Sequence, residues 1–163
     1  MPADNQYSTN LNCSISKMSV YTNQFDHRLD AIVTGCYVLT SDADENGQRH
    51  YCEAESACWD TGATNTSISP AIIEALQLKA VGKTQVSTFG GHIVDSDVYV
   101  IDLMLPGNIK VENLNVLSAE SEDYDVVIGM DVMTLGDFCL SNKDGKTCFS
   151  FRLPSKEHIV LSD

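Results

Sequence analysis

An aspartate at the end of an apolar stretch is the residue best suited to chemistry in this sequence. Asp60 follows Trp59 and precedes Thr61 and Gly62, so a strand would deliver its carboxylate into a tight turn that glycine permits. A neighbouring hydroxyl and exposed backbone N–H groups would hold that carboxylate in one orientation. Two such carboxylates about 3 Å apart share one proton, because both cannot ionise at that distance. One can then act as a general base on water while the other donates a proton.

Asp-Thr-Gly is also the composition of an ordinary turn, so the surrounding motifs matter. A double glycine, Gly90-Gly91, separates two strand-like stretches at residues 83–88 and 93–105, which predicts a hairpin. Further along, Val127 and Ile128 are followed by Gly129 and then by Met130 and Asp131. The sequence thus holds three ordered motifs: an aspartate turn, a glycine hairpin and an apolar-apolar-glycine segment.

These three motifs resemble those of the retropepsin-like aspartic proteases, the half-length relatives of pepsin. The similarity runs from about Val33 to Leu153, and the Met-Asp extension after Gly129 is typical of cellular and prokaryotic-type members. The resemblance implies a mainly β fold, a closed retropepsin-like β-barrel that forms one acid-protease half, with one or two short helices. It also implies an aspartic endopeptidase that hydrolyses peptide bonds and needs neither a metal ion nor an organic cofactor.

The resemblance assigns roles to the residues of the first motif. Asp60 would be the catalytic aspartate, and Thr61, Gly62 and Ala63 would form the active-site loop. Thr61 would hold two such loops together across a dimer, and Gly62 would let the chain approach its partner closely. Asp131 is expected to have a structural role at the start of a helical turn.

The glycine hairpin lies where the family has its flap, a hairpin that closes over an extended peptide and excludes water. Phe89 and Ile93 could then line substrate pockets around Gly90 and Gly91, although ordinary hairpin packing would explain both side chains equally well. His92 is expected to be a solvated loop residue.

The sequence contains a single Asp-Thr-Gly, so one chain supplies half of a carboxylate pair. Hydrolysis therefore requires a symmetric homodimer in which Asp60 meets the partner's Asp60. The alternative is a non-catalytic module of the same fold that dimerises or binds extended peptides.

A competing motif favours calcium binding. Asp42, Asp44, Asn46, Gly47 and Glu53 fit the spacing of an EF-hand loop, whose oxygen ligands would hold Ca²⁺. An EF-hand needs flanking helices, however, and both flanks here have strand character. An acidic hairpin loop is the simpler interpretation.

Short strands with turns between them account for most of the chain, and no internal repeat is present. Beyond the two strands of the glycine hairpin, we expect strands at residues 31–40, 49–59, 111–117, 126–128, 137–141 and 147–153, with a hairpin turn at Asp144-Gly145. A helix is expected over residues 70–78, capped by Ser69 with Pro70 in its first turn. A single helical turn is expected at residues 130–135.

Composition limits the partners. The formal net charge is −13, which argues against nucleic acid and against anionic membrane surfaces. No segment predicts a signal peptide or a bilayer-spanning helix, and the six cysteines lack a disulfide-framework context. We therefore expect a cytoplasmic protein with reduced thiols, consisting of a polar tail at residues 1–18 and one domain at residues 19–163.

Overall fold

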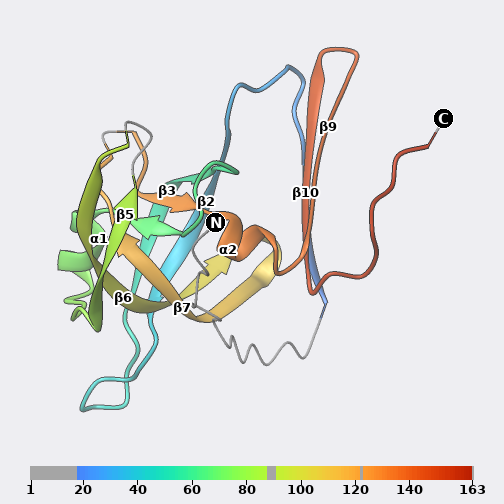
Figure 1. The fold of residues 1–163 in the computed structure, drawn as a ribbon. Coiled ribbons are helices and arrows are strands. Elements are labelled where there is room, and N and C mark those ends of the chain that lie inside the picture. The colour runs from blue at the N-terminus through green and yellow to red at the C-terminus, as the bar shows by residue number, and fades with distance from the viewer. Residues whose placement is uncertain (1–17, 88–90, 122, 163) are drawn as a thin grey trace.

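The structure is a computed structural model that describes residues 18–87, 91–121 and 123–162. These residues form ten strands, two short α-helices and one 3₁₀ turn, which are joined by loops (Figure 1). The strands are β1 (Ser19–Gln24), β2 (Ile32–Thr40), β3 (Tyr51–Trp59), β4 (Ser67–Ile68), β5 (Gly82–Ser87), β6 (Ile93–Leu105), β7 (Ile109–Ser118), β8 (Val126–Ile128), β9 (Asp137–Lys143) and β10 (Lys146–Leu153). The helices are α1 (Pro70–Ala75) and α2 (Met130–Met133), and the 3₁₀ turn is η1 (Pro106–Asn108). The class is mainly β, as the sequence predicts.

The larger sheet closes into a barrel. Its strand order is β2-β3-β8-β4-β7-β6-β5, and β2 also pairs with β6, so six strands form a ring and β5 extends from β6. Apolar side chains fill the interior, including Val38, Ile101, Leu103, Val111 and Ile128, all fully buried. Closure removes the exposed edges of these six strands, whereas β5 keeps one edge that no described strand pairs.

The end of β8 lies beneath the loop that links β3 to β4. β8 runs parallel to β3 and antiparallel to β4, so it is inserted between two strands that follow each other in sequence. The chain leaving β3 at Trp59 must therefore cross over the end of β8 before it re-enters the sheet at Ser67. This crossing positions the loop that begins at Asp60.

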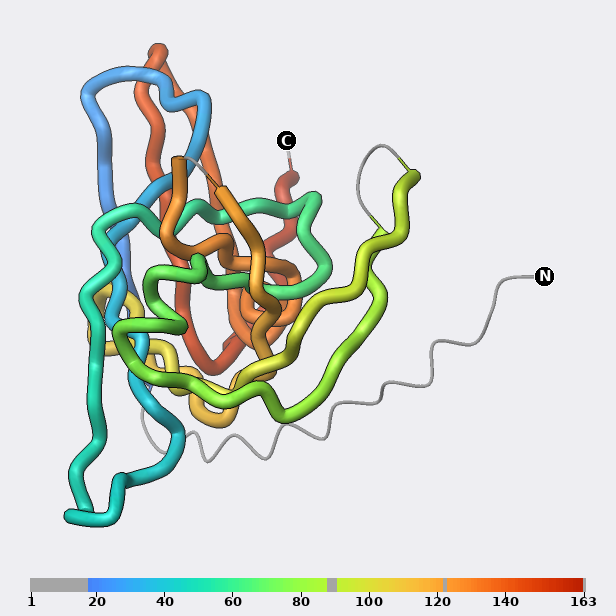
Figure 2. Tube along the Cα trace, turned by 90° about the vertical axis from the view of Figure 1, so that its left-hand side faces the viewer, coloured from blue at the N-terminus to red at the C-terminus, as the bar shows by residue number. Residues whose placement is uncertain are grey.

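A second sheet covers one side of the barrel. Its order is β1-β10-β9, and its buried face carries an aromatic cluster around Trp59. The Trp59 ring centroid lies 5.0 Å from those of Phe149 and Phe151 and 6.0 Å from that of Phe138. The β5–β6 hairpin (yellow-green) and the β9–β10 hairpin (red) project from different sides of the barrel (Figure 2).

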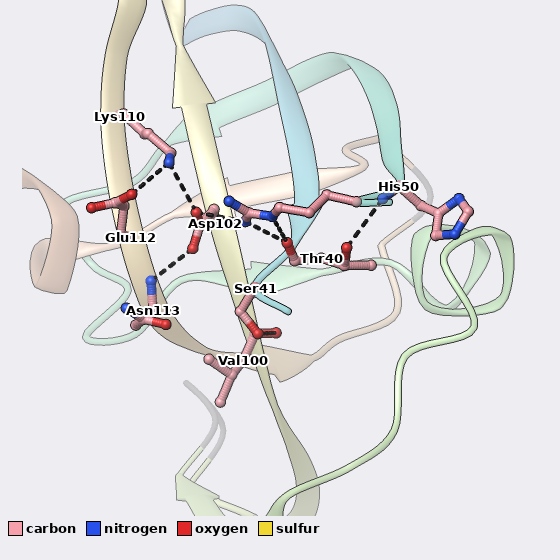
Figure 3. A network of polar contacts seen from close by, with 9 residues as sticks. Thr40, Ser41, His50, Val100, Asp102, Lys110, Glu112 and Asn113 are labelled. Carbon is pink, nitrogen blue, oxygen red and sulfur yellow. Dashed lines mark hydrogen bonds and ion pairs between the residues drawn. The ribbon is translucent and has the colours of Figure 1, made fainter. Parts of the chain in front are cut away.

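A charged network closes the barrel at the end of β2. Asp102 on β6 is opposite Leu39 on β2, and its buried carboxylate accepts a bond from Arg49 at 2.6 Å and pairs with Lys110 at 3.3 Å (Figure 3). It also accepts the backbone N–H of Asn113 at 2.9 Å, where β7 carries an extra residue and Asn113 has a φ of +54°. The two cations and this N–H hold the pKa of Asp102 below its usual value, although burial opposes them.

Most of the expected elements are confirmed, with small differences at their ends. The helix expected over residues 70–78 ends at Ala75, because Gln77 has a φ of +50° and the Leu78 N–H bonds back to Ile73, a pattern that terminates helices. Ser69 is the N-cap residue, but its hydroxyl makes no capping bond. The turn at Asp144 and Gly145 has positive φ at both residues, as a two-residue hairpin requires.

Residues 1–17 lie outside the described part, so the domain division near residue 18 stays a prediction. Among the residues that the structure describes, no helix is long and apolar enough to cross a membrane.

Candidate active site

Asp60 stands at the point where β3 leaves the barrel. Its backbone N–H donates to the Ile128 carbonyl at 3.0 Å, which extends the parallel β3–β8 pairing by one step. Trp59 is buried, whereas Asp60 and Thr61 are exposed. The strand therefore fixes the backbone of Asp60 and presents its carboxylate at the surface of the single chain.

A tight turn orients that carboxylate. The Gly62 N–H donates to Asp60 Oδ1 at 2.8 Å, and the Ala63 N–H donates to the Asp60 carbonyl at 3.1 Å. Gly62 is exposed and Ala63 is half-buried. The turn thus gives Asp60 the fixed orientation that the motif predicts.

The third motif is hydrogen-bonded to this turn and to the loop that follows it. The Met130 N–H donates to the Ala63 carbonyl at 2.8 Å, and the Asp131 N–H donates to the Thr64 carbonyl at 3.2 Å. A Cβ at Gly129 would lie 2.6 Å from the carbonyl carbon of Asn65, so only glycine lets the loop pass this close. The first and third motifs are therefore one structural unit.

Asp131 is bonded to the far end of the loop. Its carboxylate accepts the Thr66 N–H at 2.8 Å, the Thr66 hydroxyl at 2.7 Å and the Val132 N–H at 2.9 Å. The Thr66 oxygen in turn accepts the Gly129 N–H at 3.1 Å. Burial raises the pKa of Asp131, and the bonds from Thr66 and Val132 oppose that rise. These bonds fit the structural role that the sequence predicts for Asp131.

Comparison with known proteins agrees with this geometry. Residues 54–134 match the family described as "gag-polyprotein putative aspartyl protease", a range that includes both motifs and the glycine hairpin. No curated protein sequence matches the chain significantly. The chain belongs to the retropepsin-like aspartyl protease family.

The fold of this retropepsin-like chain has a solved counterpart. A crystal structure of a retropepsin-like aspartic protease from Rickettsia conorii superposes with a TM-score of 0.50 at 9% sequence identity. The match covers 83% of this chain and 95% of the other. At that identity the likeness concerns the fold alone. The expected retropepsin-like closed barrel with two short helices is confirmed.

The structure describes only the base of the hairpin that the sequence predicts to be the flap of this retropepsin-like chain. Phe89 and Gly90 lie outside the described residues, and Gly91 has a φ of +75°. Ile93 is opposite Ser87 in the hairpin and 67% exposed, whereas Val94 is 46% exposed and alternates to the other face. Only one of these two faces can line a cleft, so the substrate-pocket roles of Phe89 and Ile93 stay predictions.

Two residues that the sequence analysis missed support the site from inside. Thr66 is fully buried at the end of the loop, and Thr34 accepts the indole N–H of Trp59 at 3.1 Å. Both are β-branched hydroxyl residues, and nothing in their spacing marks them, because their partners are 25 or more positions away. The contact of Thr34 exists only once β2 pairs with β3, and the contacts of Thr66 exist only once the segment after β8 lies beside the loop.

The acidic loop between β2 and β3 is held by bonds within the loop. Asp44 accepts the N–H groups of Asn46 and Gln48, each at 2.8 Å, and lies 3.1 Å from His50 Nε2. Strands β2 and β3 flank the loop, as expected. Within the described residues, no three His, Cys, Asp or Glu side chains are grouped to hold a metal ion. The loop is an acidic hairpin tip.

Proposed function

We propose that this chain is one protomer of a homodimeric aspartic endopeptidase. The observation that carries the proposal is the Asp60 carboxylate, which is exposed at the end of a buried strand and oriented by the Gly62 N–H. The chain has no other Asp-Thr-Gly, so a second chain must supply the second carboxylate. Half-length domains of this family generally dimerise, which supports the same arrangement.

In hydrolysis, two equivalent carboxylates that share one proton would take separate roles, one as general base and the other as general acid. The unprotonated Asp60 takes a proton from water as the water oxygen bonds to the scissile carbonyl carbon. The partner's Asp60 gives its proton to the carbonyl oxygen. When the C–N bond breaks, the proton held by the first carboxylate passes to the leaving nitrogen. As the C=O bond re-forms, a hydroxyl of the tetrahedral intermediate returns its proton to the partner's Asp60, and the pair regains its shared proton. No cofactor enters any of these steps.

The substrate would be an extended peptide or protein segment. In this fold such a segment lies between the flap hairpin and the Asp60 loop, and main-chain hydrogen bonds hold it as an added strand. β5 is the last strand of its sheet order, so the flap hairpin has one edge that no described strand pairs. Side chains of alternating orientation would then enter pockets on either side of the scissile bond.

The test is cleavage of a peptide library by the wild-type chain and by Asp60→Asn. The substitution keeps the volume of the side chain but removes the shared proton, so kcat/KM should fall by about 10²–10⁴-fold or more. Asp144→Asn is the matched control, because it makes the same chemical change at the exposed β9–β10 turn, where asparagine also tolerates positive φ. Equal cleavage by Asp60→Asn and wild type would refute the proposal that the chain is an aspartic endopeptidase. A dimer that binds peptides without cleaving them would support the non-catalytic alternative.

We extend the proposal to a cytoplasmic location. Cys36, Cys52, Cys58, Cys139 and Cys148 are free thiols, the state that a reducing compartment maintains. Burial, aided by the charge of nearby Asp60, raises the pKa of Cys58, which keeps this thiol protonated beside the site. Fractionation of cells that produce the tagged chain tests the location.

A further inference from the structure

The loop that carries Asp60 is fixed to the barrel at two ends by different means. At its start, the Asp60 N–H bonds to the Ile128 carbonyl as part of the sheet. At its far end, Thr66 is held by the side chain of Asp131 through two bonds, at 2.7 and 2.8 Å. Asp60, Thr61, Gly62, Thr64 and Asn65 are exposed, so within the single chain hydrogen bonds hold this loop more than packing does.

The far-end attachment is suited to a carboxylate. Three donors converge on Asp131: the N–H and hydroxyl of Thr66 and the N–H of Val132. An ionised carboxylate only accepts, and bonds to it are about twice as strong as those between neutral groups. An asparagine amide would turn its NH₂ group toward at least one of these donors. The side chain type is thus matched to the donors around it.

We infer that Asp131 is a positioning residue for Asp60, acting through Thr66 to hold the far end of the active-site loop. This inference rests on the proposed function. The Thr66 hydroxyl donates to Asp131 and accepts from Gly129, so one side chain joins the loop both to the carboxylate and to the glycine over which the loop passes. Without the Asp131 carboxylate, the loop keeps its backbone bonds, including the one from the Leu117 N–H to the Thr66 carbonyl, but the N–H and hydroxyl of Thr66 lose their acceptor, so the far end of the loop can shift. A displacement of about 1 Å at a reacting group can cost about 10²-fold in rate.

The experiment compares kcat and KM for the wild type, Asp131→Asn, Thr66→Val and Thr66→Ser, per folded chain. Trp59 is the only tryptophan and is buried, so its fluorescence reports the folded fraction. We expect Asp131→Asn and Thr66→Val each to lower kcat about 10- to 100-fold with little change in KM. Thr66→Ser keeps the hydroxyl and should retain kcat within about threefold.

Asp102→Asn is the matched control. Asp102 is likewise a bonded aspartate, holding Arg49, Lys110 and the Asn113 N–H. Asp102 on β6 is opposite Leu39 on β2, and Leu39 is in turn opposite Tyr51, the first residue of β3. Tyr51 lies about 26 Å along β3 from Asp60, so Asp102 is far from the proposed site. The Asp102→Asn substitution should lower the stability of the fold and leave kcat per folded chain unchanged. An equal fall in kcat for Asp102→Asn would reduce the effect of Asp131 to general destabilisation and overturn the inference.

A second measurement does not depend on activity. The Gly62 N–H donates to the Asp60 carboxylate, so its amide proton shift in ¹H–¹⁵N NMR spectra reports the orientation of Asp60. Asp131→Asn and Thr66→Val should move this resonance, whereas Thr66→Ser and Asp102→Asn should not. If Asp131→Asn does not fold, Thr66→Val, which removes a single hydroxyl, supplies the same comparison. An unmoved resonance with unchanged kcat overturns the inference, whereas cleavage by Asp60→Asn instead refutes the proposed function.

Discussion

The Gly62 N–H lies 2.8 Å from Oδ1 of Asp60, and a Cβ built on Gly62 would lie 3.1 Å from the same oxygen. The glycine therefore has two functions at one atom, because its N–H orients the carboxylate and its missing side chain leaves room for it. Replacement by alanine brings a methyl group against the oxygen that the proposed reaction uses.

Gly62→Ala should lower kcat/KM about tenfold or more, because the Asp60 carboxylate must rotate or shift by a few tenths of an ångström. Gly62 has no positive φ, so the free energy of unfolding should change by less than about 1 kcal/mol. Sedimentation of the variant separates a misplaced carboxylate from a weakened dimer. Full activity in Gly62→Ala would show that the close contact has no catalytic consequence.

Gly129→Ala should destabilise the fold strongly. The new Cβ would overlap the Asn65 carbonyl group at 2.6 and 2.9 Å, and both the loop and β8 are held by backbone bonds that resist movement. We expect a loss of about 2–4 kcal/mol in urea unfolding, within the range of overpacked or strained sites. Gly82→Ala is the control, since nothing lies within 4 Å of a Cβ there and its φ is not positive. Similar losses in both variants would contradict the close-approach argument.

Activity per chain should fall on dilution, because each proposed site needs two subunits and mass action separates them. Each protomer carries a formal charge of −13, so added salt should strengthen association by screening the repulsion between like-charged chains. Analytical ultracentrifugation beside an activity assay at matched concentrations measures both effects. A fully active monomer at every concentration would exclude the homodimer.

Asp102 should make the protein less stable in acid. Its folded-state pKa is lowered by Arg49, Lys110 and the Asn113 N–H, which outweigh its burial. Just below the usual value of 3.8 the unfolded chain therefore binds more protons than the folded one, and stability falls as pH decreases through the folded-state pKa. Asp102→Asn should be roughly 1–3 kcal/mol less stable near neutral pH, and this deficit should shrink toward pH ~3. Urea unfolding from pH ~3 to ~7 measures the difference, and a deficit independent of pH would refute the assignment.

The sequence alone determined the local features of this protein. Asp60-Thr61-Gly62 predicts a turn after a strand, Asp144-Gly145 predicts a hairpin, and the short β-branched stretches predict a mainly β chain. These signals are readable because turn residues and period-two alternation act between close neighbours. The likeness of the three motifs to one family was readable for the same reason, since each motif is contiguous.

Only the tertiary structure decided how the motifs meet. The insertion of β8 between β3 and β4 places Gly129 beneath the Asp60 loop and brings the Asp131 carboxylate to Thr66, 65 positions earlier in the chain. β4 itself, Ser67–Ile68, is too short to carry a periodic signal. Its strand character comes from pairing with β7 and β8, which are far away in sequence. Long-range pairing and burial define these contacts, and neither is encoded in the spacing of neighbouring residues.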